Sequence, residues 1–316
     1  MLEKTIELKK KIQELDNLQD KLDVLHGAYH GETCYMITCG PSINDIWTER
    51  IEEILDHNLA VAVKQAYDLA PHVMDFHLLN PWNYKTYEYP EQKPIVLMLQ
   101  QSELTLTLPK SVYDLAFDLP QEACKPEKTL ALNRNFEDYL FTKRLDRPWG
   151  QGIIYELGIY LAVHLGVSEL IVVGWDIGGP RSRNYKHFYD ISNLQFWDKA
   201  RISGIEAKPI TSLFRRLYSL LKNKFIGVLI SCKLLPVRLR HRLFVQTHTD
   251  STRYYHDTRT GKATEIYNSP LLQVGEVELV ADSTEELYYW LRKKGIDLKV
   301  VSDRSLVHPC VPRIEL

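Results

Sequence analysis

The stretch CYMITCGPSINDI, residues 34–46, decides the fold of this chain. It opens with a short apolar run, residues 34–38, passes through the turn-forming sequence Gly40-Pro41-Ser42, and continues as a helix that starts near Ile43. A buried strand that ends in a tight glycine turn and leads directly into a helix is typical of a parallel sheet covered by helices.

The same alternation continues along the chain. Five further runs have the length and apolar content of buried strands: residues 59–63 (LAVAV), 75–79 (DFHLL), 94–99 (PIVLML), 169–173 (ELIVV) and 297–301 (DLKVV). Helices are expected at residues 152–165 and 283–294, the second opening with a capping box of Ser283 and Glu286 and closing at Gly295. The pattern predicts an α/β fold with a doubly wound, Rossmann-like parallel sheet.

The chain begins with a heptad-like pattern. Leu8, Leu15 and Leu22 repeat every seven residues, with Leu18 and Leu25 on the second seam, which predicts a single helix over residues 1–28. Two uses of this helix remain open. It pairs with another subunit to form a homo-oligomer, or it packs as an amphipathic helix on its own domain.

The alternation of strands and helices stops between residues 178 and 276, a stretch that is aromatic, basic and irregular. We therefore expect an N-terminal helix (1–30), a nucleotide-binding core (31–177), an inserted lid (178–276) and a C-terminal helix and strand that complete the core (277–316). Residues 201–243 hold ten Lys or Arg and one acid, a charge of +9, so the remainder carries −11 to reach the net −2. This segment predicts docking on an anionic membrane surface, with a solvated lid helix or an acidic-acceptor groove as alternatives.

Composition excludes several classes of protein. The 316 residues are 45% hydrophobic and 25% charged, as in globular proteins, and the net charge of −2 argues against nucleic-acid binding. Five cysteines without a CxxC pair disfavour a disulfide scaffold or a zinc site. The apolar runs are too short for a membrane span and the N-terminus does not look like a secretory signal. The expected location is the cytoplasm, peripheral to the inner face of the membrane.

Three polar motifs follow expected strands or open a helix. In an open α/β sheet, ligands bind where the strands end and the chain order reverses. Gly40, Pro41 and Ser42 lie at such an end, where free helical amides suit a phosphate, although a simple turn with Ser42 as N-cap is an alternative. Asn80 follows the strand at 75–79 and can read a base or ribose, or form an Asx turn. Gln151 and Gly152 open a helix after Arg147, which can counter the charge of a substrate.

A fourth group of polar residues follows the strand at 169–173. Asp176 ends this strand, and the turn after it gathers Tyr185, His187 and Tyr189 with several cations. Such a set suits an anionic substrate and a general base, with His187 as the base and Asp176 as its orienting group or as a nucleophile. No GxGxxG follows the first strand, and Walker A, HExxH and GxSxG motifs are missing from the sequence, so NAD chemistry, P-loop chemistry and the common hydrolases lose their specific support.

Together these motifs resemble the bacterial sialyltransferases of glycosyltransferase family 42, with the MptE-like proteins and CMP-Kdo-type glycosyltransferases as broader relatives. The resemblance rests on GPSIND, on LLNPWNY and on RPWGQGIIYELGIYLAVHLGVSELIVVGWDI, and it extends to STEELYYWLRKKGIDLKVVS. It covers residues 33–177 and 283–310 and implies a variant of the GT-A arrangement.

The resemblance implies roles for individual residues. Gly40, Pro41 and Ser42 would contact the CMP phosphate and ribose, Asn80 the cytidine, and Gln151 with Gly152 the donor carboxylate and base. Arg147, Tyr185 and Tyr189 would contact the substrate. The chain has Cys39 where the family has an asparagine, and Gln65 stands near the place of another asparagine that reads the nucleotide. The base histidine of the family lies late in the lid, so His248 and His256 compete with His187.

The resemblance therefore implies a glycosyltransferase. It would move a sialic-acid-like or Kdo-like sugar from a CMP-activated donor to a surface glycan of the lipopolysaccharide or capsule type, without a cofactor or a required metal. Inverting transfer would use a histidine base, and retaining transfer a carboxylate such as Asp176 or Glu103. The alternatives are a pterin diphosphokinase that needs ATP and Mg²⁺, and an inactive protein that binds a nucleotide or a glycan.

Overall fold

The structure is a computed structural model of the whole chain. It describes residues 2–79, 87, 89–90, 92, 94–100, 113–119, 135–147, 153–176, 253–256, 263–266, 276–302 and 307–316. Of residues 253–256, 263–266 and 276–282 it describes the backbone only.

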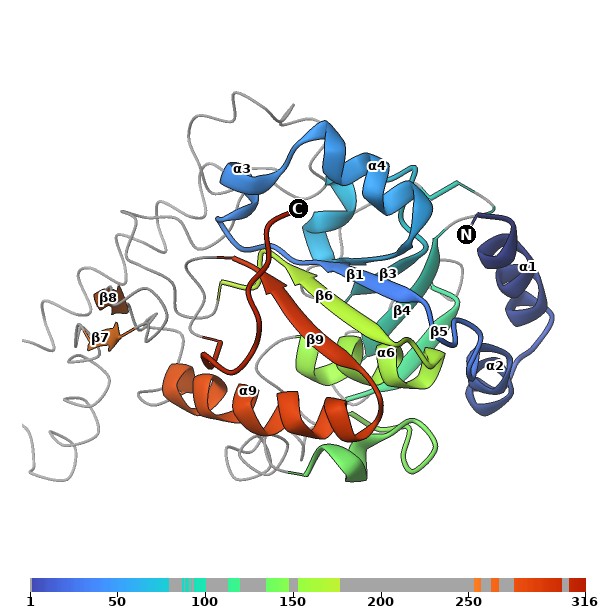
Figure 1. The fold of residues 1–316 in the computed structure, drawn as a ribbon. Coiled ribbons are helices and arrows are strands. Elements are labelled where there is room, and N and C mark those ends of the chain that lie inside the picture. Colours follow the sequence, from blue (N-terminus) through green and yellow to red (C-terminus); the bar gives the residue numbers. More distant parts are fainter. Residues whose placement is uncertain are drawn as a thin grey trace, which may run out of the picture.

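A seven-stranded parallel sheet forms the centre of the molecule (Figure 1). Its order is β5-β4-β3-β2-β1-β6-β9. The strands are β1 (Thr33–Ile37), β2 (Leu59–Val63), β3 (Phe76–Leu79), β4 (Ile95–Gln100), β5 (Leu115–Asp118), β6 (Glu169–Val173) and β9 (Asp297–Val301). The predicted α/β, Rossmann-like fold is therefore confirmed. Strands β2, β6 and β9 have the predicted bounds, whereas β5 was not predicted.

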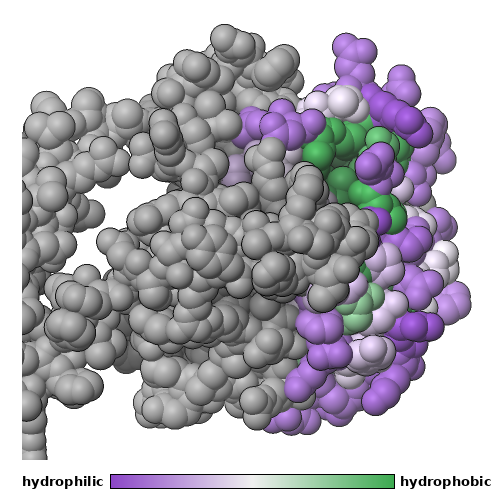
Figure 2. Space-filling view, turned by 60° about the vertical axis from the view of Figure 1, so that its left-hand side comes forward, coloured by the Kyte–Doolittle hydropathy of each residue, from purple (hydrophilic) through white to green (hydrophobic). Residues whose placement is uncertain are grey.

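Both faces of the sheet are buried, as its apolar runs require. In β1, Cys34 and Met36 enter one core cluster, while Tyr35 and Ile37 enter the other. Successive side chains of a strand point to opposite faces, so an uninterrupted apolar run serves both cores at once. In Figure 2 the described surface is mainly hydrophilic, with hydrophobic residues exposed beside the grey atoms.

Helices cover the two faces of the sheet (Figure 1). One face carries α3 (Ile43–Ile46), α4 (Glu49–His57) and the 3₁₀ segment η1 (Lys64–Leu69). The other carries η5 (Phe136–Tyr139), the π-helical turn η6 (Ile154–Gly158), α6 (Ile159–Leu165) and α9 (Glu276–Lys293). Gly158 packs on this face so closely that a Cβ would lie 2.8 Å from the sulfur of Met36.

The N-terminal segment forms two helices, so the prediction of a single helix was wrong. Helix α1 (Leu2–Gln13) and helix α2 (Leu18–Leu25) are separated at Asn17, whose side chain accepts a hydrogen bond from the amide of Gln19 and begins α2. Leu22 and Leu25 are fully buried in the same cluster as the sheet. The apolar seam therefore packs on its own domain.

Buried polar contacts fix this helical pair to the sheet. The hydroxyl of Thr5 donates to Asp75 at 2.6 Å, and Asp75 in turn accepts from the amide of Ala60 at 3.0 Å. The ammonium of Lys9 donates to the carbonyl of Pro94 at 2.8 Å. These contacts make α1 an integral part of the core.

The C-terminal helix also differs from its prediction. Helix α9 is already formed at Glu276, so Ser283 and Glu286 do not open it, and the predicted capping box was wrong. The hydroxyl of Ser283 instead lies 3.1 Å from that of Tyr155 across the core. Gly295, with φ +80°, follows the helix as predicted.

Most of the predicted lid lies outside the described residues. Within it the structure describes the backbone of an antiparallel hairpin, β7 (Arg253–His256) and β8 (Ala263–Ile266). The basic segment 201–243 lies wholly outside the described ranges, so its membrane docking and the predicted domain boundaries stay predictions.

Candidate functional site at the reversal of strand order

Strand order reverses between β1 and β6. The chain proceeds from β1 to β5 on one side of the sheet, and β6 then pairs with β1 on the other side. The turns that follow β1 and β6 lie side by side, because the amide of Gly40 donates to the carbonyl of Gly174 at 3.0 Å. Ligands of open α/β sheets bind at this place, so the structure brings the predicted Gly40–Ser42 turn and Asp176 together there.

The two turns approach so closely that Gly40 cannot carry a side chain. A Cβ at this position would lie 2.0 Å from the carbonyl oxygen of Gly174 and 2.4 Å from Oδ2 of Asp176. Glycine is therefore required here by contact between two loops.

Asp176 joins three loops at the carboxyl ends of adjacent strands. Its Oδ2 accepts from the amide of Ser42 at 2.6 Å, and its Oδ1 accepts from the hydroxyl of Ser302. Ser302 directly follows β9, so the carboxylate links the ends of β1, β6 and β9. Both carboxylate oxygens are engaged, and this geometry makes Asp176 a positioning residue.

The first turn of α3 does not offer the expected free amides. The amide of Ser42 binds Asp176, and those of Ile43 and Asn44 donate to the carbonyls of Gly40 and Pro41, both at 3.2 Å. A phosphate in this turn would also meet the negative charge of Asp176. The turn is therefore unsuited to a phosphate, contrary to the sequence-based expectation.

Three buried polar atoms in this turn and in the segment that follows β2 have no hydrogen-bond partner among the described residues. They are Oγ of Ser42, Oε1 of Gln65 and the hydroxyl of Tyr67, in residues that are 1%, 5% and 2% exposed. Ser42 is helical and its side chain does not cap α3, so the simple N-cap interpretation was wrong. A buried polar atom without a partner costs about 1–3 kcal/mol, which a bound polar ligand would recover.

Gln65 and Tyr67 belong to the segment after β2, which is strained. Lys64, the first residue of η1, has φ +54°, a left-handed conformation that non-glycine residues rarely adopt. The thiol of Cys39 donates to the carbonyl of Val63 at 3.1 Å and so ties this segment to the Gly40 turn. Strain of this kind is concentrated at functional sites.

His77 contacts the backbone of the same segment. Its Nε2 donates to the carbonyl of Lys64 at 2.7 Å, so Nδ1 accepts from the hydroxyl of Tyr89, also at 2.7 Å. Burial lowers the pKa of His77 to about 3, and the ring of Tyr67 stacks on it at 4.6 Å. Burial also raises the pKa of Cys39 to about 11. Neither group is therefore a base or nucleophile at neutral pH.

Arg147 has a structural role. Its side chain is fully buried, and its three nitrogens donate to the carbonyls of Asp146, Tyr139 and Arg144. The guanidinium also lies 5.0 Å from the ring centre of Phe141. Burial lowers the pKa of Arg147 to about 10. The side chain offers no exposed surface to a substrate, so we leave it out of the candidate site.

The remaining predicted site residues lie outside the described ranges: Asn80, Gln151, Gly152, Tyr185, His187, Tyr189 and the alternative base His248. His256 lies in β7, where only the backbone is described. Asn80 directly follows the last residue of β3, Leu79. Sequence reasoning missed the stack of Tyr67 on His77, because no motif marks a contact between two neighbouring strand ends.

Two features are missing from the described residues. These residues contain no group of three or more His, Cys, Asp or Glu residues arranged to hold a metal ion. Within the same ranges, no helix has the length and apolar content needed to cross a membrane.

Comparisons with known proteins leave the family open. No family model matches the chain, and no curated protein matches it. Among solved structures, a MAf glycosyltransferase from Magnetospirillum magneticum AMB-1 matches over 51% of this chain with 17% identity and a TM-score of 0.32. The match spans 25% of that chain. A similarity this low does not establish a shared activity, and the resemblance to the sialyltransferases stays a prediction.

Proposed function

We propose that the protein is a glycosyltransferase that uses a CMP-activated sugar of the 2-keto-3-deoxy acid class. The observation that carries the proposal is the group of unpartnered buried polar atoms of Ser42, Gln65 and Tyr67, which lies where open α/β sheets bind nucleotides. The sequence motifs around Gly40 and Asn80 add support, because they resemble those of enzymes that use such donors.

The proposed binding mode assigns the nucleoside to the end of the sheet. The hydroxyl of Ser42 donates a hydrogen bond to the nucleoside or accepts one from it. Oε1 of Gln65 accepts a hydrogen bond from a ribose hydroxyl or from the cytosine amine. Asp176 keeps the Gly40 turn in place through the amide of Ser42. Because its carboxylate repels a phosphate, we assign the turn to ribose or base and expect the phosphate further from Asp176.

The proposed reaction is an inverting displacement. The acceptor oxygen forms a bond to the anomeric carbon, the bond from that carbon to the phosphate oxygen breaks, and CMP leaves with the electron pair. His187 takes the proton of the acceptor hydroxyl as general base. The alternative, retaining transfer with Asp176 as nucleophile, is disfavoured because both oxygens of Asp176 already accept hydrogen bonds.

Nucleotide binding gives the first test. CMP should raise the melting temperature of the protein, whereas a rise with ATP and Mg²⁺ alone would favour the pterin diphosphokinase alternative. No response to any nucleotide would favour a glycan-binding protein and contradict the proposal. Incubation with a panel of CMP-sugars, with CMP release as the readout, then tests the reaction and identifies the donor.

A matched pair of serine variants tests the site itself. Ser42→Ala should lower the affinity for CMP about fivefold, since one hydrogen bond contributes about 1 kcal/mol, and leave the free energy of unfolding nearly unchanged. The control is Ser168→Ala, next to the amino end of β6, where the hydroxyl donates to the carbonyl of Gly31 at 2.8 Å. Equal affinities for CMP in the two variants would remove Ser42 from the site.

Residues 201–243 remain a proposed contact with anionic membranes, based on their charge of +9. Sedimentation with vesicles that contain an anionic lipid tests it. Binding should weaken with salt and disappear when Arg238, Arg240 and Arg242 become Glu, and absence of binding at low salt would contradict it.

A further inference from the structure

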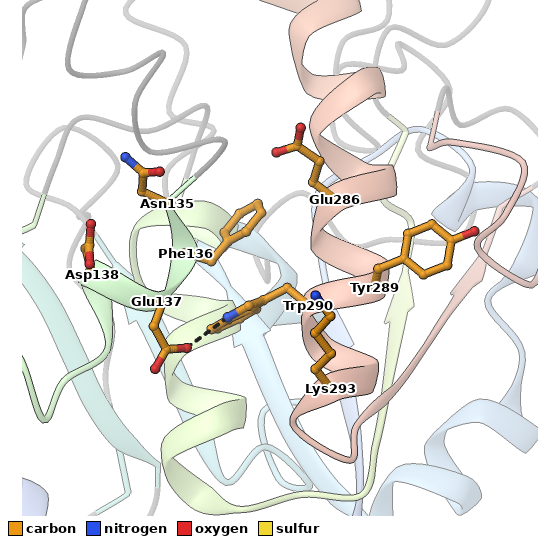
Figure 3. A pocket seen from close by; sticks show the side chains of 8 residues that line it. All are labelled: Asn135, Phe136, Glu137, Asp138, Glu286, Tyr289, Trp290 and Lys293. Carbon is orange, nitrogen blue, oxygen red and sulfur yellow. Dashed lines mark hydrogen bonds between the residues drawn. The ribbon is translucent and has the colours of Figure 1, made fainter.

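A cavity lies between η5 and α9, on the face of the sheet that carries α6 (Figure 3). Its volume of about 430 Å³ is within the range of small-molecule sites. Eight residues from these two segments line it: Asn135, Phe136, Glu137, Asp138, Glu286, Tyr289, Trp290 and Lys293. Neither the proposed nucleotide site nor any sequence motif accounts for it.

The floor of the cavity is aromatic and fixed. Figure 3 shows Phe136 and Trp290 between the two walls, and their ring centres are 5.4 Å apart with planes tilted by 30°. The indole nitrogen of Trp290 donates to Glu137 at 3.1 Å. Lys294 and Lys143 lie 2.7 and 3.3 Å from the same carboxylate, so the charge of Glu137 is compensated within the protein.

The rim of the cavity is polar and exposed. Figure 3 shows Glu286 on the α9 wall and Asn135 and Asp138 on the wall opposite. All three side chains are exposed and make no hydrogen bond with any described residue. Tyr289, at the outer edge, is 49% exposed, more than other large hydrophobic side chains in the described ranges.

These surroundings select the chemistry of a ligand. Three carboxylates, Glu137, Asp138 and Glu286, are balanced by Lys143, Lys293 and Lys294, so the charges at the cavity sum to zero and give a charged ligand no net attraction. An aromatic floor suits the apolar C–H face of a sugar ring, and a rim of amide, carboxylate and ammonium groups suits its hydroxyls, which both donate and accept.

We propose that this cavity binds a neutral saccharide. Trp290 of the cavity floor follows Ser283 on α9 by seven residues, a rise of about 10 Å along the helix. Ser283 contacts Tyr155, whose ring centre is 5.9 Å from that of Trp175, the residue before Asp176. The cavity is thus separate from the nucleotide site and joined to it by packed side chains. That the saccharide is part of the acceptor glycan rests on the proposed function, whereas saccharide binding itself does not.

The test titrates the full chain with maltose, lactose and cellobiose, and binding is followed by ligand-detected NMR. At least one disaccharide should bind, and Asn135→Ala on one wall and Glu286→Ala on the other should each weaken it about tenfold. Arg292→Ala is the matched control, because Arg292 is exposed on α9 but does not line the cavity, and it should bind normally. Folding of each variant is checked by its melting temperature.

Two further measurements keep the alternatives apart. Glu286→Gln should keep most of the affinity for a neutral sugar, and spermidine should not bind the wild type tightly. Tight spermidine binding that disappears in Glu286→Gln would show a cation site and overturn the proposal. Absence of binding by all three disaccharides at millimolar concentration, or equal binding by all variants, would also overturn it. Disaccharide binding without any response to CMP would leave this site standing and contradict only the proposed function.

Discussion

The Gly40–Ser42 turn and Arg147 were both expected to bind a ligand. The structure shows that they differ in how their polar groups are hydrogen-bonded. Both are buried and polar. Arg147 donates to three backbone carbonyls and has no exposed surface, whereas Ser42 Oγ is buried beside the reversal of strand order without a partner among the described residues. Residue type does not distinguish the two places. Whether the hydrogen-bonding capacity of a buried group is already used does distinguish them.

The largest expected effect comes from Arg147→Ala. The change removes a fully buried side chain and leaves the carbonyls of Tyr139 and Arg144 without a donor, which should lower the free energy of unfolding by about 4 kcal/mol. Unfolding in urea measures this loss of stability. The control is Arg144→Ala, because Arg144 is an exposed neighbour and its removal should cost about 1 kcal/mol or less. A stable Arg147→Ala protein that no longer binds CMP would show that Arg147 serves ligand binding and not stability.

Gly40→Ala should come next. A Cβ here would lie 2.0 Å from the carbonyl oxygen of Gly174, so the two turns must separate, at a cost of about 3 kcal/mol and with loss of CMP binding. Gly31→Ala is the control, because Gly31 has φ +81° but open space around it, and should cost about 1 kcal/mol. If both variants unfold at the same urea concentration and bind CMP alike, the close approach at Gly40 does not matter.

The smallest effect concerns Glu137, close to Arg147 in sequence. Hydrogen bonds from Lys294 first, and then from Trp290 and Lys143, lower the pKa of Glu137 to about 2. Because the folded pKa lies below the ordinary value of 4.5, this carboxylate stabilises the protein above pH 4.5, and the stabilisation is lost as the pH falls toward 2. The carboxylate is half exposed, so Glu137→Gln should cost about 1 kcal/mol or less at pH 7.

The pH dependence provides the check for Glu137. The difference in unfolding free energy between the wild type and Glu137→Gln should shrink between pH 4.5 and 2. A difference that is constant across that range would mean that Glu137 contributes through packing and not through its charge.

Sequence reasoning was accurate where local pattern and burial agree. The runs LAVAV, ELIVV and DLKVV form β2, β6 and β9 with the predicted bounds, because short runs rich in apolar residues are typical of the buried strands of a parallel sheet. The prediction also placed Gly40 and Asp176 at strand ends, and the reversal of strand order brings them together.

Sequence reasoning failed where the local structure depends on residues far away in the sequence. Ser283 looks like a cap, but its hydroxyl faces Tyr155, and the helix begins before it. The helix predicted from the leucine heptad is interrupted at Asn17, whose side chain caps α2. Gln65 was noticed as a substitution, but the unpartnered state of its oxygen depends on packing that no local pattern reveals.

The contact between Asp176 and Ser302 also has a consequence for biosynthesis. The two residues are 126 positions apart, and a ribosome adds about 5–20 residues per second, so Asp176 is made about 6–25 seconds before its partner. During that interval the edge of β6 that later pairs with β9 is open, and an open strand edge invites pairing with other chains. The nascent protein therefore passes through a period in which most of its core is translated but Asp176 has not yet met Ser302, and binding by a chaperone would protect it most during that period.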